Sequence, residues 1–115
     1  MKTLVIMPTY GRLPFLNRAL ASFLLQTYDD KELVIINDDK NVEIKCEYPN
    51  VTCINIDKRI LTGQKKNIAT NIGFHNIYIP FDDDDIMLPN RIENCVKIHN
   101  DNPDIELYWN KWSYS

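Results

Sequence analysis

Four consecutive aspartates, residues 82–85, are the residues of this chain whose types and spacing best suit chemistry. Carboxylates packed side by side repel one another, so the cluster is unfavourable unless a cation or solvent relieves its charge. Oxygen ligands favour magnesium and manganese, and Asp82 and Asp84 can both reach one ion where the backbone turns. The alternative is a solvated acidic turn in which Asp85 caps a helix that begins near Pro89.

The elements that position these aspartates follow from the hydrophobic pattern of the chain. The aspartates come directly after an apolar run that predicts a buried strand. From Pro14 onward the apolar residues change to helical spacing, with Phe15 among those expected to face inward. Strands are predicted at residues 3–7, 32–36, 51–56, 77–81 and 105–109, and helices from residue 14, at residues 64–72 and from residue 89. This alternation predicts an α/β domain with a mostly parallel sheet flanked by helices on both faces.

Polar residues gather where three of these strands end. They are Thr9 and Tyr10, the run of residues 37–39, and the four aspartates. Because ligands bind at the carboxyl ends of parallel strands, these clusters predict one functional edge. Tyr10 is suited to stacking on a base or to ordinary packing. Asp38 can accept a hydrogen bond from a base N–H or a ribose hydroxyl, or can serve as a turn residue.

Composition bounds the class of protein. A chain of 115 residues predicts one domain, and the net charge of −3 gives no electrostatic case for binding nucleic acid. The three glycines form no phosphate-binding loop or dinucleotide fingerprint. Lys65 and Lys66 can neutralise phosphate charge, with a solvated start of a helix as the alternative for at least one of them.

The cysteines and apolar runs bear on location. Cys46, Cys53 and Cys95 lack the paired spacing of a zinc site, and we interpret them as reduced thiols of a cytoplasmic protein. A single disulfide is the alternative for an exported protein. No run resembles a signal peptide or is long enough to cross a membrane.

With these clusters placed, the chain resembles the nucleotide-sugar-binding half of family 2 glycosyltransferases, which have the GT-A fold. Residues 5–12 look like the family's opening strand and P-T-Y-N-R turn, and residues 19–28 are similar to its first helix. Residues 32–39 match its E-x-x-V-V-x-D-G-S strand, with Asp39 in the place of glycine. Residues 63–69 are similar to its G-x-x-x-A-R-N segment, and residues 81–93 to its D-x-D segment and following helix.

The resemblance implies a ligand for each cluster. Asp82 and Asp84 would form the D-x-D pair that binds Mn²⁺ or Mg²⁺, with Asp84 as the direct ligand. Asp83 would lie near the ribose or the diphosphate of the donor. The activity implied is metal-dependent transfer of a sugar from a nucleoside diphosphate sugar, a UDP-sugar in most of the family, to an acceptor hydroxyl.

The resemblance also assigns the remaining contacts to the donor. Thr9, Tyr10 and Asp38 would frame the base, most often uracil in this family. Lys66 stands where the family has arginine, so it keeps the positive charge without the bidentate geometry. Asp39, in place of glycine, puts the turn after Asp38 in question.

Family members usually continue into an acceptor-binding half that carries the general base. We expect residues 1–115 to form a single nucleotide-sugar-binding domain truncated before that half, and no residue is assigned as the base. The alternative is a non-catalytic nucleotide-sugar-binding module. A sugar-phosphate nucleotidyltransferase is disfavoured, because residues 8–12 lack the glycine-rich first loop of that class. The aromatic residues of the C-terminal segment, 108–114, predict self-association or contact with a partner domain.

Overall fold

The computed structural model describes residues 2–11, 13–60, 62–71, 75, 77–81 and 86–101. The elements in chain order are β1 (Thr3–Thr9), α1 (Leu13–Leu24), β2 (Lys31–Asn37), β3 (Val51–Asn55), α2 (Thr62–Thr70), β4 (Ile77–Pro80) and α3 (Arg91–Asp101). These strands form a sheet in the order β3-β2-β1-β4, and each neighbouring pair is parallel. The predicted α/β architecture with a parallel sheet is confirmed.

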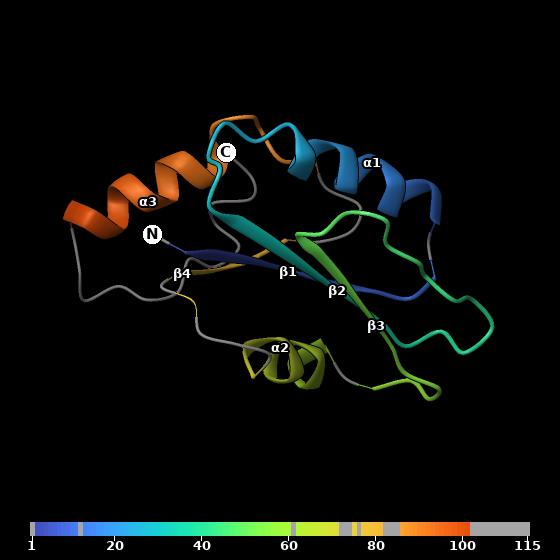
Figure 1. The fold of residues 1–115 in the computed structure, drawn as a ribbon. Helices are drawn as coiled ribbons and strands as arrows, with labels where there is room; N and C mark the ends of the chain where they lie inside the picture. The colour runs from blue at the N-terminus through green and yellow to red at the C-terminus, as the bar shows by residue number, and fades with distance from the viewer. Residues whose placement is uncertain are drawn as a thin grey trace.

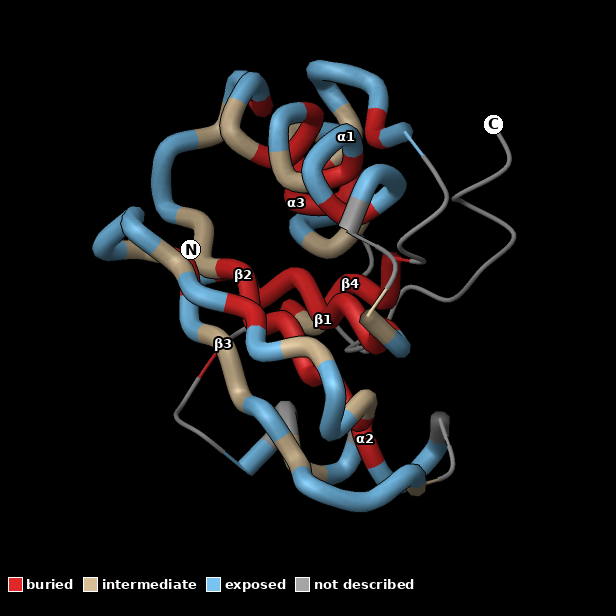
Figure 2. The backbone as a smooth tube through the Cα atoms, turned by 90° about the vertical axis from the view of Figure 1, so that its right-hand side faces the viewer, coloured by how far each residue is buried: buried red, intermediate tan, exposed pale blue. Residues whose placement is uncertain are grey.

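Helices cover both faces of this sheet, with α1 and α3 on one side and α2 on the other (Figure 1). Alternate residues of each strand point to opposite faces, so β1 and β2 supply two separate apolar layers. The first layer, with α1 and α3, contains Val5, Met7, Leu33 and Ile35, and the second, with α2, contains Leu4, Ile6, Val34 and Ile36. Figure 2 shows β1, β2 and β4 as the buried centre between these helices, with the edge strand β3 more exposed. The continuously apolar centre of β2 is explained by this double cover.

Helix α1 buries a narrower face than its sequence predicts. Leu16, Ala19 and Phe23 are buried at helical spacing. Phe15, which we expected to face inward, is 44% exposed, and the Arg18 guanidinium carbon lies 5.6 Å from the centre of its ring. The inward prediction for Phe15 is therefore wrong, because the burial stripe of α1 follows Leu16, Ala19 and Phe23 and leaves the neighbouring position in solvent.

Strand β1 extends further than predicted, whereas β3 and β4 each end one residue earlier. We expected Pro8 to end the first strand, yet β1 continues to Thr9 and pairs with β2 over its whole length. Proline is tolerated there because β4 pairs with β1 only as far as Ile6, so Pro8 lies beyond that ladder. Residues 40–50 form a loop without a helix. The strand predicted at residues 105–109 lies outside the described residues.

The cysteines correct one of our expectations. Cys46 and Cys53 form a disulfide with their Cα atoms 6.1 Å apart, and Cys95 is a buried free thiol. The prediction of reduced thiols is thus wrong for two of the three, because the loop before β3 folds back along that strand and brings two positions seven residues apart within disulfide range. The cytoplasmic location, inferred partly from reduced thiols, loses that support and stays a prediction. Among the described residues, no helix is both long and apolar enough to span a bilayer.

Candidate functional site

The carboxyl ends of three adjacent strands form a row of polar residues. Thr9 of β1 is in register with Asn37 of β2, and Asn37 is in register with Asn55 of β3. Thr9 and Asn37 are buried, with 3% and 1% exposure. A buried polar group must be hydrogen-bonded, so this row fixes the loops that leave the sheet at this edge.

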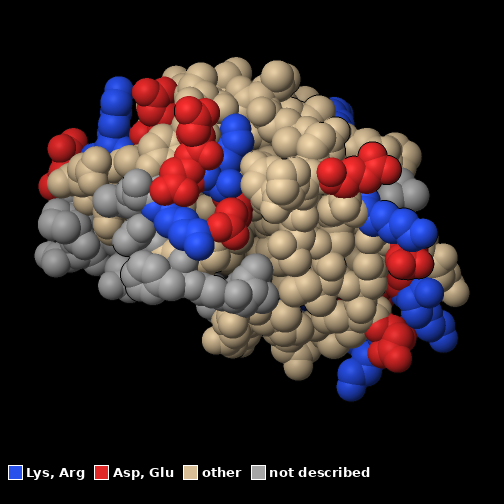
Figure 3. Space-filling model, viewed as in Figure 1, with Lys and Arg blue, Asp and Glu red and all other residues tan. Residues whose placement is uncertain are grey.

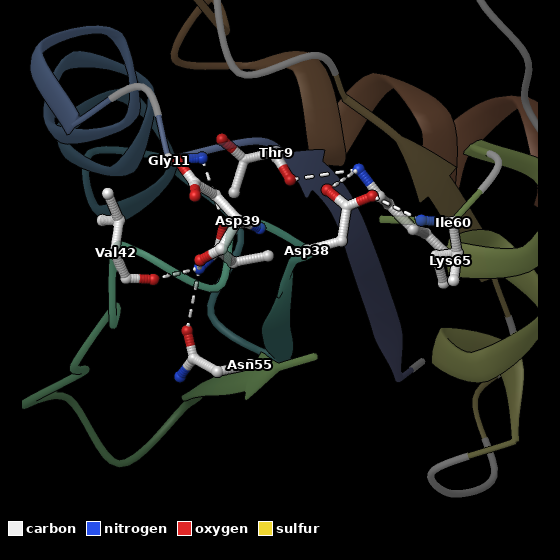
Figure 4. A network of polar contacts seen from close by, with 9 residues as sticks. Thr9, Gly11, Asp38, Asp39, Val42, Asn55, Ile60 and Lys65 are labelled. Carbon is white, nitrogen blue, oxygen red and sulfur yellow. Dashed lines mark hydrogen bonds and ion pairs between the residues drawn. The ribbon is translucent and has the colours of Figure 1, made fainter. Parts of the chain in front are cut away.

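Asn37 is the hub of these loops. Its Oδ1 accepts hydrogen bonds from the backbone N–H groups of Gly11 (3.0 Å) and Asp39 (3.1 Å). Its Nδ2 donates to the Val42 carbonyl (2.6 Å) and to Asn55 Oδ1 (3.1 Å) (Figure 4). One buried amide thereby joins the turn after β1, the loop after β2 and the end of β3.

Asp38 and Lys65 form a buried ion pair beside this hub. Lys65 Nζ lies 2.6 Å from Asp38 Oδ1, and the two side chains are 7% and 0% exposed. The Ile60 N–H donates to Asp38 Oδ2 (2.8 Å), and Lys65 Nζ also donates to the Thr9 carbonyl (3.1 Å) (Figure 4). The Lys65 ammonium thus neutralises Oδ1 and the Ile60 N–H occupies Oδ2, so both carboxylate oxygens have a partner inside the protein. Burial alone would raise the pKa of Asp38, but the contacts from Lys65 and Ile60 together hold that pKa below its ordinary value.

The turn after Asp38 is built without a glycine. No non-glycine residue among those described has a positive φ, so Asp39 fits the turn in an ordinary backbone conformation. Its Oδ1 accepts from the Asn41 N–H (3.0 Å), and its Oδ2 lies against Gly11, which has a φ of 63°. A side chain on residue 11 would collide with that carboxylate. The question raised by Asp39 is therefore answered: Gly11 leaves the space that the aspartate fills.

Tyr10 carries the exposed aromatic face of the edge. Its side chain follows Thr9 directly and is 41% exposed. The guanidinium carbon of Arg59 lies 4.3 Å from the centre of the Tyr10 ring. Arg59 belongs to the segment between β3 and α2, so this contact joins two of the loops at the edge.

The structure brings together three of the predicted site residues and leaves the others undescribed. Thr9, Tyr10 and Asp38 meet at one edge, with Lys65 bridging Asp38 to Thr9. Lys66 lies in α2, but its side chain is outside the described part of the chain, as are Asp82, Asp83 and Asp84. In the described portion, no group of three or more His, Cys, Asp or Glu residues could hold a metal ion. The metal prediction thus rests on the aspartates after β4.

Sequence reasoning missed the importance of Lys65 and Asn37. We weighed Lys65 only as a phosphate contact or a solvated residue, whereas it is 6% exposed and neutralises Asp38. Its spacing of three residues from the inward Ile68 was a signal that it faces the sheet. Asn37 directly follows an apolar strand, which places it at the edge but gives no sign of its four partners.

Charge at this edge is mixed. Figure 3 shows Lys and Arg alternating with Asp and Glu at the right-hand side, where Figure 1 shows the strands ending. A cavity of about 230 Å³ opens beside the hub, lined by residues that include Asp39, Glu43, Asn55 and Asp57. Its three carboxylates outnumber Lys40, the one cation in its lining, which disfavours an anionic ligand, and neither Tyr10 nor Asp38 lines it.

A parallel sheet with helices on both faces, whose polar loops converge at the carboxyl edge, defines the class of open α/β domains. Within that class the model of glycosyl transferase family 2 matches residues 4–113, and the chain belongs to this family. An uncharacterized glycosyltransferase of Rickettsia typhi is 30% identical over 113 residues, covering 90% of this chain and 34% of that protein. The uncharacterized glycosyltransferase YwdF of Bacillus subtilis is 31% identical over 101 residues, covering 84% and 38%. The chain spans about a third of the length of these relatives.

Solved structures share this architecture. TarS of S. aureus in complex with UDP-GlcNAc has a TM-score of 0.74 and 18% identity, covering 90% of this chain and 32% of that one. The mannosyltransferase PcManGT of Pyrobaculum calidifontis, in complex with GDP-Man and Mn²⁺, has a TM-score of 0.74 and 19% identity, covering 88% and 33%. Both confirm the GT-A fold expected from the sequence.

Proposed function

We propose that the chain is the donor-binding part of a glycosyltransferase that moves a sugar from a UDP-sugar to an acceptor hydroxyl. The observation that supports this most directly is the convergence of Thr9, Tyr10 and Asp38 at one sheet edge in a chain of family 2. An edge with a buried, hydrogen-bonded frame and one exposed aromatic face suits a flat base.

In this proposal the residues of the edge contact different parts of the donor. Tyr10 offers its ring to the base, and Thr9 and Asp38 frame that base from the ends of β1 and β2. Asp38 would act from beneath the exposed surface, because its side chain is 0% exposed and paired with Lys65. Lys66, at the position of the family's arginine, contributes positive charge toward the diphosphate.

The diphosphate and a divalent metal belong at the end of β4. Phe81, the last residue described there, is buried, and its N–H donates to the Ile6 carbonyl (2.9 Å), so the chain leaves the sheet beside β1. In the proposal Asp82 and Asp84 hold Mn²⁺ or Mg²⁺, and Asp83 lies near the ribose or the diphosphate. Such an ion would offset the charge that develops on the departing nucleotide. PcManGT was solved with GDP-Man and Mn²⁺, which supports the choice of ligand class.

A second candidate is a nucleotide-sugar-binding module without transferase activity. Both candidates share the donor-binding edge formed by Thr9, Tyr10 and Asp38, and they differ in whether the sugar leaves the bound donor. The first candidate also requires an acceptor-binding part, which would hold a saccharide or another hydroxyl compound. The predicted self-association through residues 108–114, which lie outside the described part, can be measured by sedimentation.

Titration calorimetry with UDP, UDP-GlcNAc and GDP, each with and without Mn²⁺, tests the proposal. We expect metal-dependent binding of UDP and its sugar, loss of the metal-dependent part in Asp84→Ala, and little change in the matched control Asp85→Ala. Full manganese dependence in Asp84→Ala would refute that residue as the ligand, and absence of nucleotide binding by the wild type would refute both candidates. Release of UDP from UDP-sugars in the presence of candidate acceptors separates the transferase from the binding module.

A further inference from the structure

Arg59 lies over the predicted base-stacking residue on a segment that is anchored at both ends. The Ile56 N–H donates to the Asn37 carbonyl (2.8 Å), and the Ile60 N–H donates to Asp38 Oδ2 (2.8 Å). These bonds fix the backbone on either side of Arg59 to the end of β2. The side chain of Arg59 is itself exposed and reaches across to the Tyr10 ring.

The Arg59 guanidinium is available to a ligand. Within the described part of the chain it makes no ion pair with a carboxylate, and its contact there is the ring of Tyr10. An exposed cation–π contact is weak, so an incoming ligand can open it at small cost. Tyr10, in contrast, follows the buried Thr9 and precedes Gly11, whose N–H is held by Asn37. The backbone is thus held on both sides of the contact, and the long, exposed side chain of Arg59 is the part that can move.

We propose that Arg59 and Tyr10 are the two walls of a slot for the nucleobase of the donor. This inference rests on the proposed function and adds a residue that the family motifs do not include. The base enters between the ring and the guanidinium, which must separate by the thickness of one ring, about 3.5 Å. It then stacks on Tyr10 with one face and receives the guanidinium on the other, as bases do between aromatic rings and arginine planes.

The slot makes a prediction that separates it from a phosphate contact. Stacking acts on the base, so loss of the guanidinium should weaken binding of uridine and of UDP by the same factor. A phosphate contact would weaken UDP alone. A guanidinium that merely covers Tyr10 in the free protein would compete with the base, and its removal would strengthen binding of both.

The experiment measures dissociation constants for uridine and for UDP with Mg²⁺ by NMR chemical-shift titration of the full chain. Four proteins are compared at one salt concentration: wild type, Arg59→Ala, Arg59→Lys and Lys58→Ala. Lys58 is a matched control, because it is an exposed cation one residue away in the same segment. We expect Arg59→Ala to bind both ligands about tenfold more weakly, Arg59→Lys to fall between it and the wild type, and Lys58→Ala to bind uridine as the wild type does.

Several results would overturn the slot. They are a loss confined to UDP, tighter binding by Arg59→Ala, or equal losses of uridine binding in Arg59→Ala and Lys58→Ala. Unchanged binding in Arg59→Ala, with both ligands bound by the wild type, would overturn the slot alone. A wild type that binds neither ligand would overturn the proposed function and the slot with it.

Discussion

Two ion pairs, at opposite edges of the sheet, connect β2 or the loop after it to distant parts of the chain. At the carboxyl edge Lys65 pairs with Asp38, and both side chains are at most 7% exposed. At the amino edge Glu32 accepts contacts from His75 Nε2 and from Lys2 Nζ, each at 3.3 Å, and the Glu32 side chain is 39% exposed. Both partners are therefore buried at the carboxyl edge, whereas at the amino edge Glu32 and Lys2 reach water and His75, at 2% exposure, is buried.

The difference in burial indicates that the two ion pairs have different roles. A buried ion pair loses much of its Coulomb energy to desolvation, so stability alone is a weak reason to bury one. At the carboxyl edge the pair has a further consequence, since Lys65 also holds Thr9 and Asp38 also holds the segment that carries Arg59. The amino-edge pair joins the starts of the strands, away from Thr9, Tyr10 and Arg59. We infer that burial at the carboxyl edge serves to position the site.

The largest expected effect comes from removing the cation of the buried pair. Lys65→Met keeps the apolar stem but leaves Asp38 buried and uncompensated, which should cost about 3 kcal/mol of unfolding free energy. The matched change at the amino edge, Lys2→Met, should cost less than about 1 kcal/mol, because Lys2 is 45% exposed. Urea unfolding at pH 7 measures both. Equal losses would contradict the distinction between the edges.

A smaller effect is expected at Gly11. An alanine there must adopt a φ near 63° and meet the carboxylate of Asp39, so Gly11→Ala should lose about 1–2 kcal/mol. Gly63→Ala is the matched control, because nothing lies within 4 Å of the added carbon and the residue is helical. The control should lose no stability in thermal unfolding. If Gly11→Ala were as stable as the control, the fit between Gly11 and Asp39 would not constrain the turn.

The sequence predicted the parallel sheet and the shared edge of the polar residues after β1 and β2, because both follow from the spacing of residues along the chain. The apolar centre of β2 required helices on both faces, and polar residues after each strand required one shared edge. The burial of Lys65 was harder to predict than the sheet, since a lysine at the start of a helix is usually solvated. The disulfide could not be predicted either. Cys46 lies in a loop without periodicity, and its approach to Cys53 depends on how that loop folds.

The smallest expected effect comes from Glu32 and concerns its response to pH. Burial alone would raise the pKa of Glu32, but contacts from His75 and Lys2 lower it below its ordinary value. A carboxylate with a lowered pKa stabilises the fold above the pKa of the unfolded chain, about 4.3, and this contribution disappears as the pH falls through the folded pKa. Glu32→Gln should therefore lose well under 1 kcal/mol at pH 7, given the exposure of the side chain, and its deficit should close below about pH 4.

The Glu32→Gln comparison uses urea unfolding of variant and wild type at intervals from pH 7 to pH 3. Asp38→Asn, measured alongside, should show a deficit of the same sign that is larger at pH 7, because the pKa of Asp38 is lowered in a buried setting. A Glu32→Gln deficit that stays constant down to pH 3 would mean that the amino-edge contacts act through packing rather than charge. The two ion pairs would then differ in kind, and the contrast between the edges would be sharper than burial alone makes it.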